Sequence, residues 1–224
     1  MGAAVAKPLV RTMSAQLTAL VRARIVSGAY APGAALLQDA LAAEFGVSKI
    51  PVREALLHLH AEGLVDVFAH RGFQVRPLSA REAQEIFQLR LRIEPQAIAS
   101  GARLAESQDR EGAQSAFQSL HEALSSGRLE GSGDLNRDFH LALVVPRRQP
   151  LTHEVLQRLL TLSQRYVRLH LEPRGRSSRA DREHEALLAA WMRGEAASAE
   201  ALSRQHIQTT YDDLARALGS DVRA

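Results

Sequence analysis

Apolar residues recur at helical spacing in three short segments near the start of the chain. The first stripe covers residues 17–25 and ends near Gly28, the second covers residues 36–45, and the third begins at Lys49 after a turn that contains Gly46. The third stripe repeats at i, i+3, i+4 and i+7, through Val52, Ala55, Leu56 and Leu59. The pattern predicts three short helices, each with one face in a small core.

Two further apolar runs follow Gly63 and have the length of strands. Residues 64–68 and 72–75 flank Ala69-His70-Arg71, so the pattern predicts a two-stranded hairpin with a basic tip. Three helices and a hairpin make a winged helix-turn-helix, in which Arg71 could enter a minor groove or meet a phosphate. The alternative is a hairpin that only covers the core, with Arg71 in solvent.

Beyond Pro77 the pattern is helical and contains no convincing strand. Ser79 and Glu82 have the spacing of a capping box, which predicts the start of a long helix that Pro95 should kink or break. Further helices are predicted over about 107–125, 132–145, 150–171, 179–193 and 195–218. The predicted organisation is a disordered N-terminus (1–12), a winged helix-turn-helix (13–77) and an all-α antiparallel bundle of six to seven helices (78–224).

The stretch after the second helix carries the local signals of a turn and a recognition helix. Gly46 can adopt the left-handed conformation that ends a helix, and Ser48 is a favourable N-cap. Pro51 then falls in the first turn, where its missing N–H needs no partner. Lys49 and Arg53 are four residues apart and share a face away from the apolar stripe. A short helix with an apolar back and a basic front suits the major groove.

Charge and composition support this interpretation. Residues 1–77 hold eight Lys/Arg and five Asp/Glu, whereas residues 78–224 hold twenty of each, so the net charge of +3 lies with the helix-turn-helix. An excess of three charges is also compatible with an ordinary solvated surface. The absence of cysteine excludes disulfides and thiolate metal ligands. Without a long apolar run or a signal peptide, the sequence predicts a soluble intracellular protein with no membrane segment.

Five motifs stand together in the first 77 residues: Gly28-x-Tyr30-x-Pro32-Gly33, Leu41-Ala42-x-x-Phe45-Gly46-Val47-Ser48, Pro51-Val52-Arg53-Glu54-Ala55-Leu56, Glu62-Gly63-Leu64-Val65 and Arg71-Gly72-Phe73-x-Val75. They resemble the winged helix-turn-helix of GntR-family bacterial transcription regulators. Four motifs follow in the helical part: Leu89-Arg90-x-x-Ile93-Glu94, Asn136-x-x-Phe139-His140, Glu183-His184 and His206-Ile207. These are similar to the FCD effector domain of the FadR subfamily. The two resemblances cover nearly the whole chain.

The resemblance implies which residues contact double-stranded operator DNA. At the start of the recognition helix and at the wing tip these are Ser48, Lys49, Pro51, Arg53, Arg71 and Gly72. Arg53 could pair with guanine O6 and N7, and Lys49 could contact a base or a phosphate. Relatives often carry arginine at position 49, and lysine lacks its planar fork. Asp39 stands where a fatty-acid-responsive relative uses arginine, so that contact is not carried over.

The resemblance also implies a divalent metal, zinc, nickel or manganese, bound inside the bundle. The implied ligands are Asn136, His140, His184 and His206. Asn136 and His140 are four residues apart and share one helix face. The family usually has aspartate at position 136, and asparagine brings no negative charge. The alternative is a polar, hydrogen-bonded pocket without metal. The remaining helical-domain histidines match no ligand position and are expected to face solvent: His121, His153 and His170.

The family's effectors are often small carboxylates, and Arg90 matches a family arginine near the pocket. An ion pair between Arg90 and Glu94, four residues on, is the structural alternative. The prediction is a bacterial cytoplasmic repressor, nucleoid-associated when bound, that acts as a homodimer on a two-fold symmetric operator and responds to a small organic acid. One alternative is a metal-dependent enzyme using the three histidines, for which Glu183 and Glu185 are the only close carboxylates. Another is a constitutive DNA-binding dimer.

Overall fold

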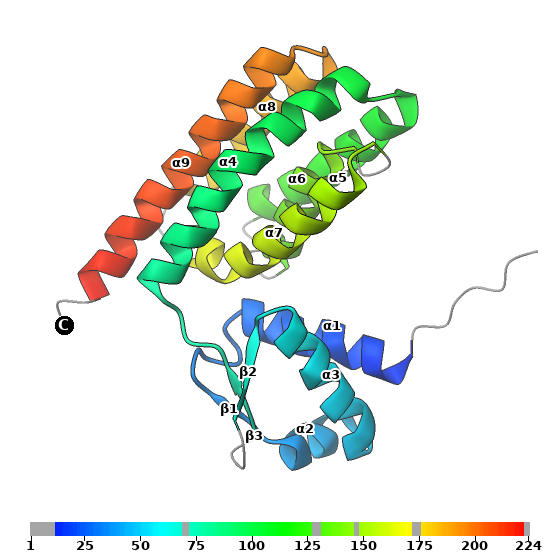
Figure 1. Ribbon diagram of the computed structural model, residues 1–224, viewed down its shortest axis with the longest axis vertical. Helices are drawn as coiled ribbons and strands as arrows, with labels where there is room; N and C mark the ends of the chain where they lie inside the picture. Colours follow the sequence, from blue (N-terminus) through cyan, green and yellow to red (C-terminus); the bar gives the residue numbers. More distant parts are fainter. Residues whose placement is uncertain (1–11, 69–71, 127–130, 146–147, 172–175, 222–224) are drawn as a thin grey trace, which may run out of the picture. The chain divides into compact units, whose positions relative to one another are not determined.

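Figure 1 shows the computed structural model, which describes residues 12–68, 72–126, 131–145, 148–171 and 176–221. Over these residues the chain is mainly helical and forms two compact units. The first unit holds the chain through Ile25 and residues 29–76, and the second holds residues 26–28 and the chain from Pro77 onward. The N-terminal segment predicted to be disordered lies outside the described residues, apart from Thr12.

The first unit is a helix-turn-helix with a small sheet. Its helices are α1 (Met13–Val26), α2 (Gln38–Phe45) and α3 (Lys49–Ala61), and the predicted stripe of α3 is buried in their common core. The predicted hairpin is formed by β2 (Val65–Phe68) and β3 (Gly72–Val75), with Val65 opposite Val75. A third strand, β1 (Ala35–Leu36), pairs with the other edge of β3. The second helix was predicted to begin at Leu36, and this start is wrong, because Leu36 lies in β1 and α2 begins at Gln38. Two residues are too few to show the alternating pattern of a strand.

The turn between α2 and α3 has the predicted glycine but not the predicted side-chain cap. Gly46 is left-handed, at φ 64° and ψ 36°, and its N–H donates to the carbonyls of Ala42 and Ala43. Ser48 occupies the N-cap position of α3 in an extended conformation, but its side chain accepts no capping hydrogen bond. That part of the prediction is wrong. The exposed Ser48 side chain is therefore not used to cap α3.

The second unit is all-helical over its described residues and confirms the predicted fold class. Its six helices are α4 (Ala80–Leu104), α5 (Ser107–Ser125), α6 (Ser132–Ala142), α7 (Pro150–Leu171), α8 (Arg176–Met192) and α9 (Ala196–Asp221). Figure 1 shows α4 and α9 side by side along most of their length. The large side chains of Ile98, Phe139, Leu156 and Trp191 are fully buried at the centre of this unit.

The start of α4 is fixed by one half of the predicted capping box. The Ser79 hydroxyl accepts a 3.3 Å hydrogen bond from the Glu82 N–H, but the Glu82 carboxylate accepts one of 2.8 Å from the Tyr166 hydroxyl. Burial, together with this carboxylate, raises the pKa of Tyr166 to about 12, so the phenol stays a donor at neutral pH. The bond ties the first turn of α4 to α7.

Pro95 does not break α4. The helix runs without interruption from Ala80 to Leu104, and Pro95 is buried within it. A proline inside a helix removes one backbone hydrogen bond and costs about 3 kcal/mol. The buried face of α4, which packs against α9 and α7, offsets this cost through apolar burial. The predicted break is therefore wrong, because tertiary packing outweighs the local preference.

None of the helices in the described part of the chain combines the length and hydropathy that crossing a membrane requires. In the second unit, two backbone segments approach closely at Gly101 on α4. A Cβ at this position would overlap the carbonyl oxygen of Leu143, just after α6, and would lie 3.1 Å from Trp191 Nε1. The same carbonyl accepts a 2.9 Å hydrogen bond from Trp191 Nε1. Glycine is needed here for close approach of two backbones.

We expect Gly101→Ala to lower the free energy of unfolding by about 1–3 kcal/mol, because the added methyl group forces the Leu143 carbonyl and Trp191 apart. Urea denaturation followed by circular dichroism measures the change. The matched control is Gly112→Ala in α5, where a Cβ meets nothing within 4 Å. Alanine should raise stability there by about 0.5–1 kcal/mol through helix propensity. Equal stability of the two variants would contradict the close approach.

Candidate functional site

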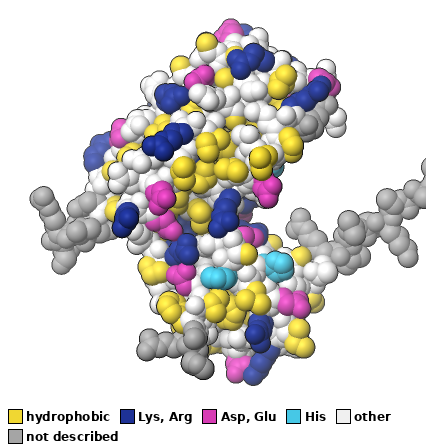
Figure 2. All heavy atoms as spheres, in the orientation of Figure 1, with side chains coloured by type: hydrophobic (Ala, Val, Ile, Leu, Met, Phe, Trp, Pro, Cys, Tyr) yellow, Lys and Arg dark blue, Asp and Glu magenta, His cyan; other side chains and the backbone are white. Residues whose placement is uncertain are grey.

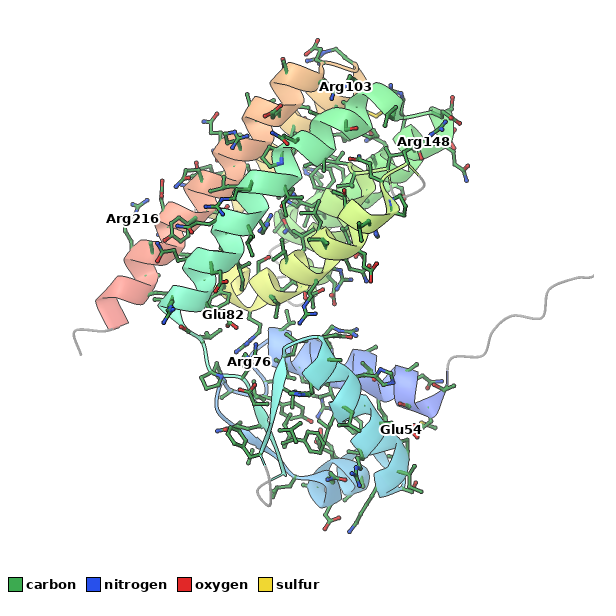
Figure 3. The ribbon with its side chains drawn as sticks, in the orientation of Figure 1. Glu54, Arg76, Glu82, Arg103, Arg148 and Arg216 are labelled. Atoms are coloured by element: carbon green, nitrogen blue, oxygen red, sulfur yellow. The ribbon has the colours of Figure 1, made fainter. Side chains whose placement is uncertain are left out.

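The first turn and outer face of α3 form a charged surface in the first unit. Lys49, Arg53 and Glu54 are all exposed, while the apolar stripe points inward as predicted. Figure 3 shows Glu54 on the outer side of the helix. Within the described part of the chain, no hydrogen bond or ion pair engages the Arg53 side chain. Its guanidinium is therefore available to an external acceptor.

Lys49 is not equally available. Its Nζ lies 2.5 Å from Oδ1 of Asp39 in the first turn of α2, and the two side chains are 66% and 74% exposed. The ion pair bridges the two helices of the helix-turn-helix on the solvent side. The sequence alone shows Asp39 only as a position where the arginine–DNA contact of a relative is not carried over. Its pairing with Lys49 depends on the angle between α2 and α3, which spacing does not reveal.

One further residue of this surface was missed. Ile50 is 71% exposed in the first turn of α3, beside Lys49 and the half-buried Pro51. An exposed isoleucine on the same surface as the basic residues Lys49 and Arg53 could contact a thymine methyl group in a major groove. The signal was present in the sequence, since position 50 falls outside the buried stripe.

The wing is only partly described. Gly72 begins β3 with φ 81°, a conformation that favours glycine, and a Cβ there would meet nothing within 4 Å. Val67 and Phe68, at the end of β2, are exposed. Arg71, the predicted DNA contact at the wing tip, lies outside the described residues.

In the second unit the structure brings together the three predicted histidines. His140 comes from α6, His184 from α8 and His206 from α9, and all three are buried. One ring nitrogen from each lies within 4.8 Å of the others. Asn136, the fourth predicted ligand, lies one turn before His140 on α6 and is half-buried. His121, by contrast, is exposed and bonds to Asp181.

Two carboxylates fix the ring orientation of two of the histidines. Glu94 Oε1 accepts a 2.6 Å hydrogen bond from His140 Nδ1, and Glu183 Oε2 accepts one of 2.7 Å from His206 Nδ1. An ionised carboxylate cannot donate, so the proton of each neutral ring is on Nδ1 and the lone pair is on Nε2. Glu94 was considered only as a partner of Arg90. The sequence did not show that α4 and α6 place Glu94 against His140.

The residues present fit a divalent metal. His140 Nε2 is a buried atom with no hydrogen-bond partner among the described residues. His184 Nε2 lies 3.2 Å from His206 Nε2. Two nitrogens bound tetrahedrally to one zinc ion at about 2.0–2.1 Å would be roughly 3.3 Å apart. Imidazole nitrogens with carboxylates behind them are typical ligands of zinc and nickel.

The surroundings of His184 favour a neutral imidazole. Burial holds the pKa of His184 well below its ordinary value, and the neighbouring His206, His140 and Arg90 add to this, against a small opposite effect of Glu94. The neutral ring retains the lone pair that a metal needs at neutral pH. Burial alone would raise the pKa of Glu94. Arg90 and His140 instead hold it well below the usual range, so Glu94 is ionised.

Arg90 forms the ion pair considered as an alternative to effector binding. Its side chain is 2% exposed, and its Nε lies 2.8 Å from Glu94 Oε2, while Glu94 is 0% exposed. Arg90 Nη1 donates to the Ser163 hydroxyl at 3.3 Å. Arg90 therefore lies behind His140, connected to it through Glu94. Nε and Nη2 of the guanidinium bond to the Glu94 carboxylate, whereas Nη1 bonds to the neutral Ser163 hydroxyl.

The comparisons with known proteins agree with both units. Residues 13–75 match the family model for bacterial regulatory proteins of the gntR family, and residues 85–209, more than half of the chain, match the FCD domain. The chain is a GntR-family transcriptional regulator with an FCD domain. These families and the relatives below are DNA-binding transcriptional regulators, not enzymes, and so the enzyme alternative is wrong.

Individual relatives come from several bacteria. The transcriptional regulator McbR of Escherichia coli is 33% identical over 132 residues, which is 59% of this chain and 60% of McbR. The transcriptional repressor GlaR of Escherichia coli is 28% identical over 88% of this chain and 93% of GlaR. The chain spans less than two thirds of McbR and of YdhC from Bacillus subtilis, of which 54% is matched.

Solved structures show the same fold. The structure of Escherichia coli McbR/YncC has a TM-score of 0.78 and 25% identity, and the match covers 92% of this chain and 98% of that one. A GntR regulator from Rhodococcus has a TM-score of 0.71 at 22% identity, covering 92% and 97% of the two chains.

We expect protein purified without a histidine tag to bind about one equivalent of divalent metal per chain, and His140→Ala/His184→Ala to bind none, because the double variant removes two of three clustered nitrogens. Metal analysis after dialysis measures the ratio. His121→Ala, which alters an exposed histidine, is the control and should retain full occupancy. Absence of metal from wild-type protein supplied with zinc, nickel and manganese in turn would refute the metal site.

Proposed function

We propose that this regulator is a repressor whose DNA binding is controlled by a divalent metal and a small organic acid. The observation that carries the proposal is the buried cluster of His140, His184 and His206, backed by Glu94 and Glu183, in a chain that also has a winged helix-turn-helix. A purely dimerising bundle has no need of buried imidazole nitrogens without partners. The repressor assignment draws support from GlaR, which is described as a repressor.

On the DNA side, the first turn of α3 enters the major groove and the wing contacts the backbone or the minor groove. The contacting residues are Ser48, Lys49, Pro51, Arg53, Arg71 and Gly72, with Ile50 added by its exposure. Arg53 donates to guanine, because its planar guanidinium, which has no partner among the described residues, matches the O6 and N7 acceptors. The exposed Ser48 hydroxyl donates to a phosphate or a base edge.

In the bundle, His140, His184 and His206 hold the metal together with Asn136 as an oxygen donor. When bound, the ion supplies a positive charge that attracts an anionic ligand. Four neutral donors leave that charge uncompensated in the inner coordination shell, so a carboxylate effector is favoured over a neutral one. Zinc or nickel suits the imidazole donors best, and manganese is a third candidate.

The effector is proposed to reach the cluster through groups that already surround it. Arg90 offers its Nη1 edge, which bonds only to the neutral Ser163 hydroxyl, to the far end of a small carboxylate. A groove of about 190 Å³ between α8 and α9 is lined by Arg179, Arg182, Glu183 and His206, and so it lies beside the cluster. The Arg90 edge favours a small anion.

Coupling to DNA binding follows from α4. This helix carries Arg90 and Glu94 at its middle and begins at Ala80, directly after the segment that follows the first unit. An effector that alters the Glu94–His140 bond changes the link between α4 and α6. The coupling is reciprocal, so operator DNA should weaken effector binding by the same factor as the effector weakens DNA binding.

A homodimer is proposed on the outer face of α7. Leu151 and Val155 are 73% and 41% exposed and line a shallow apolar groove that also includes Glu154 and Arg158. Figure 2 shows hydrophobic side chains gathered on the face of the second unit where α7 runs. In a two-fold arrangement Glu154 of one chain can face Arg158 of the other, which makes the stripe self-complementary. A dimer supplies the two recognition helices that a palindromic operator needs.

We expect Arg53→Ala to weaken binding to the operator selected from a random DNA library by about 1–3 kcal/mol, because it removes a bidentate base contact. Fluorescence anisotropy at fixed salt measures the affinity. Arg193→Ala, which removes an equal charge from an exposed ion pair in the second unit, serves as the control and should bind like wild type. Unchanged operator affinity of the Arg53 variant would show that α3 is not the recognition helix.

For the sensor, small mono- and dicarboxylates should raise the melting temperature of metal-loaded protein. A ligand that binds only the folded state adds about 2.7 kcal/mol when present at 100 times its Kd. The shift should vanish in chelated wild-type protein and in the His140→Ala/His184→Ala variant, since both lack the ion. A shift that persists without metal would place the effector elsewhere. No shift with any carboxylate on metal-loaded protein would favour constitutive DNA binding.

A further inference from the structure

The ion pair between Asp39 and Lys49 lies at the part of the first unit proposed to face DNA. Asp39 is in the first turn of α2, Lys49 is the first residue of α3, and their charged atoms are 2.5 Å apart. Both side chains are mostly exposed, and no other ion pair engages either of them among the described residues. Lys49 lies one helical turn before Arg53. The surface thus presents an acceptor and a donor next to each other, close to the Arg53 guanidinium, which no described residue engages.

The pair contributes little to the stability of the fold, but it weakens the attraction of Lys49 to DNA phosphates. An exposed ion pair adds at most a small amount to folding, because water and salt screen it. However, the carboxylate cancels the charge that would attract Lys49 to any phosphate, so Lys49 adds little sequence-independent affinity. The pair also restricts the lysine side chain to positions close to Asp39. These effects disfavour a general electrostatic role for Lys49.

A carboxylate at a DNA interface also has to find a donor. Phosphates and most base-edge atoms in the major groove are acceptors, and they repel it. The donors available are the amino groups of cytosine N4 and adenine N6. Asp39 therefore penalises sequences that place no amino group opposite it, which is a repulsive contribution to specificity.

The donor and acceptor match one base pair better than the others. In the major groove a G·C pair presents two neighbouring acceptors, guanine N7 and O6, followed by the cytosine N4 amino donor. An ammonium group can donate to both guanine acceptors while the adjacent carboxylate accepts from cytosine N4. An A·T pair interrupts its two acceptors with the N6 donor and adds the thymine methyl group, so the ammonium group loses one acceptor.

We propose that Asp39 and Lys49 act together to recognise one G·C base pair in each operator half-site, and that Asp39 is a specificity-determining residue. This inference rests on the proposed function of α3 as the recognition helix. Lys49 donates to guanine and Asp39 accepts from the paired cytosine. Arg53, one turn further along α3, contacts a neighbouring position.

The test begins with operator selection from a random DNA library by wild-type protein, followed by anisotropy with operators changed at single positions. Wild type should show one G·C position, distinct from the one lost in Arg53→Ala, where replacement by A·T costs about 5–150-fold in affinity. In Asp39→Asn the preference at that position should fall by about fivefold or more. Affinity for random DNA should rise in this variant, with a salt dependence steeper by about one unit, because Lys49 is released to phosphate.

Glu54→Gln is the matched control, since it removes an exposed carboxylate from the outer face of α3 and changes the net charge equally. It should leave the preference at every position unchanged. Asp39 also lies in the first turn of α2, where a negative charge favours the helix dipole, so urea denaturation of each variant checks that folding is retained. Lys49→Gln provides a second variant and should lose the same base preference.

Two failures can be told apart. If wild type selects no operator, or Arg53→Ala binds it normally, the proposed recognition helix is wrong and this inference fails with it. If wild type selects an operator and depends on Arg53, but folded Asp39→Asn keeps the full G·C preference, only the present inference is overturned. In that case the pair is an ordinary solvated ion pair.

Discussion

The arrangement of the bundle depends on one buried, hydrogen-bonded set of side chains, from Arg90 through Glu94 to His140. Glu94 is fully buried and ionised, which would be costly without compensation. Arg90 and His140 supply it from two directions, one on the same helix and one on α6. Removing Arg90 from this set costs about 3–5 kcal/mol, because the buried Glu94 carboxylate is then left without its counter-ion. These linked side chains therefore fix the position of α6 relative to Glu94 on α4, and with it the direction of His140 Nε2.

That constraint also orients His140 in the buried histidine cluster of the second unit. Because His140 donates through Nδ1 to Glu94, its Nε2 lone pair faces inward, toward the rings of His184 and His206. Glu183 orients His206 in the same way from α8. The carboxylates also bring negative charge close to the cluster, although Asn136 brings none of its own. The proposed sensor thus draws its charge from residues behind the ligands.

The first unit shows a comparable division between burial and exposure. The stripe of α3 is buried in a small core, which leaves the opposite face free to present Arg53, Ile50 and the Lys49–Asp39 pair. These three features differ in what they offer DNA: a forked donor, an apolar side chain, and a donor adjacent to an acceptor. Base selectivity in the proposal comes from this combination, since the net positive charge of the unit is small.

The sequence by itself determined the features that depend on neighbours along the chain. Helical periodicity placed the helices of both units, Gly46 placed the turn, and the density of motifs around Arg53 indicated the family. Tertiary structure alone decided the contacts between distant segments: Glu94 with His140, Asp39 with Lys49, and β1 with β3. It also overrode two local expectations, the cap at Ser48 and the break at Pro95. The physical reason is that helix and turn preferences act over a few residues, whereas pairing of buried or cross-helix groups depends on how the helices pack.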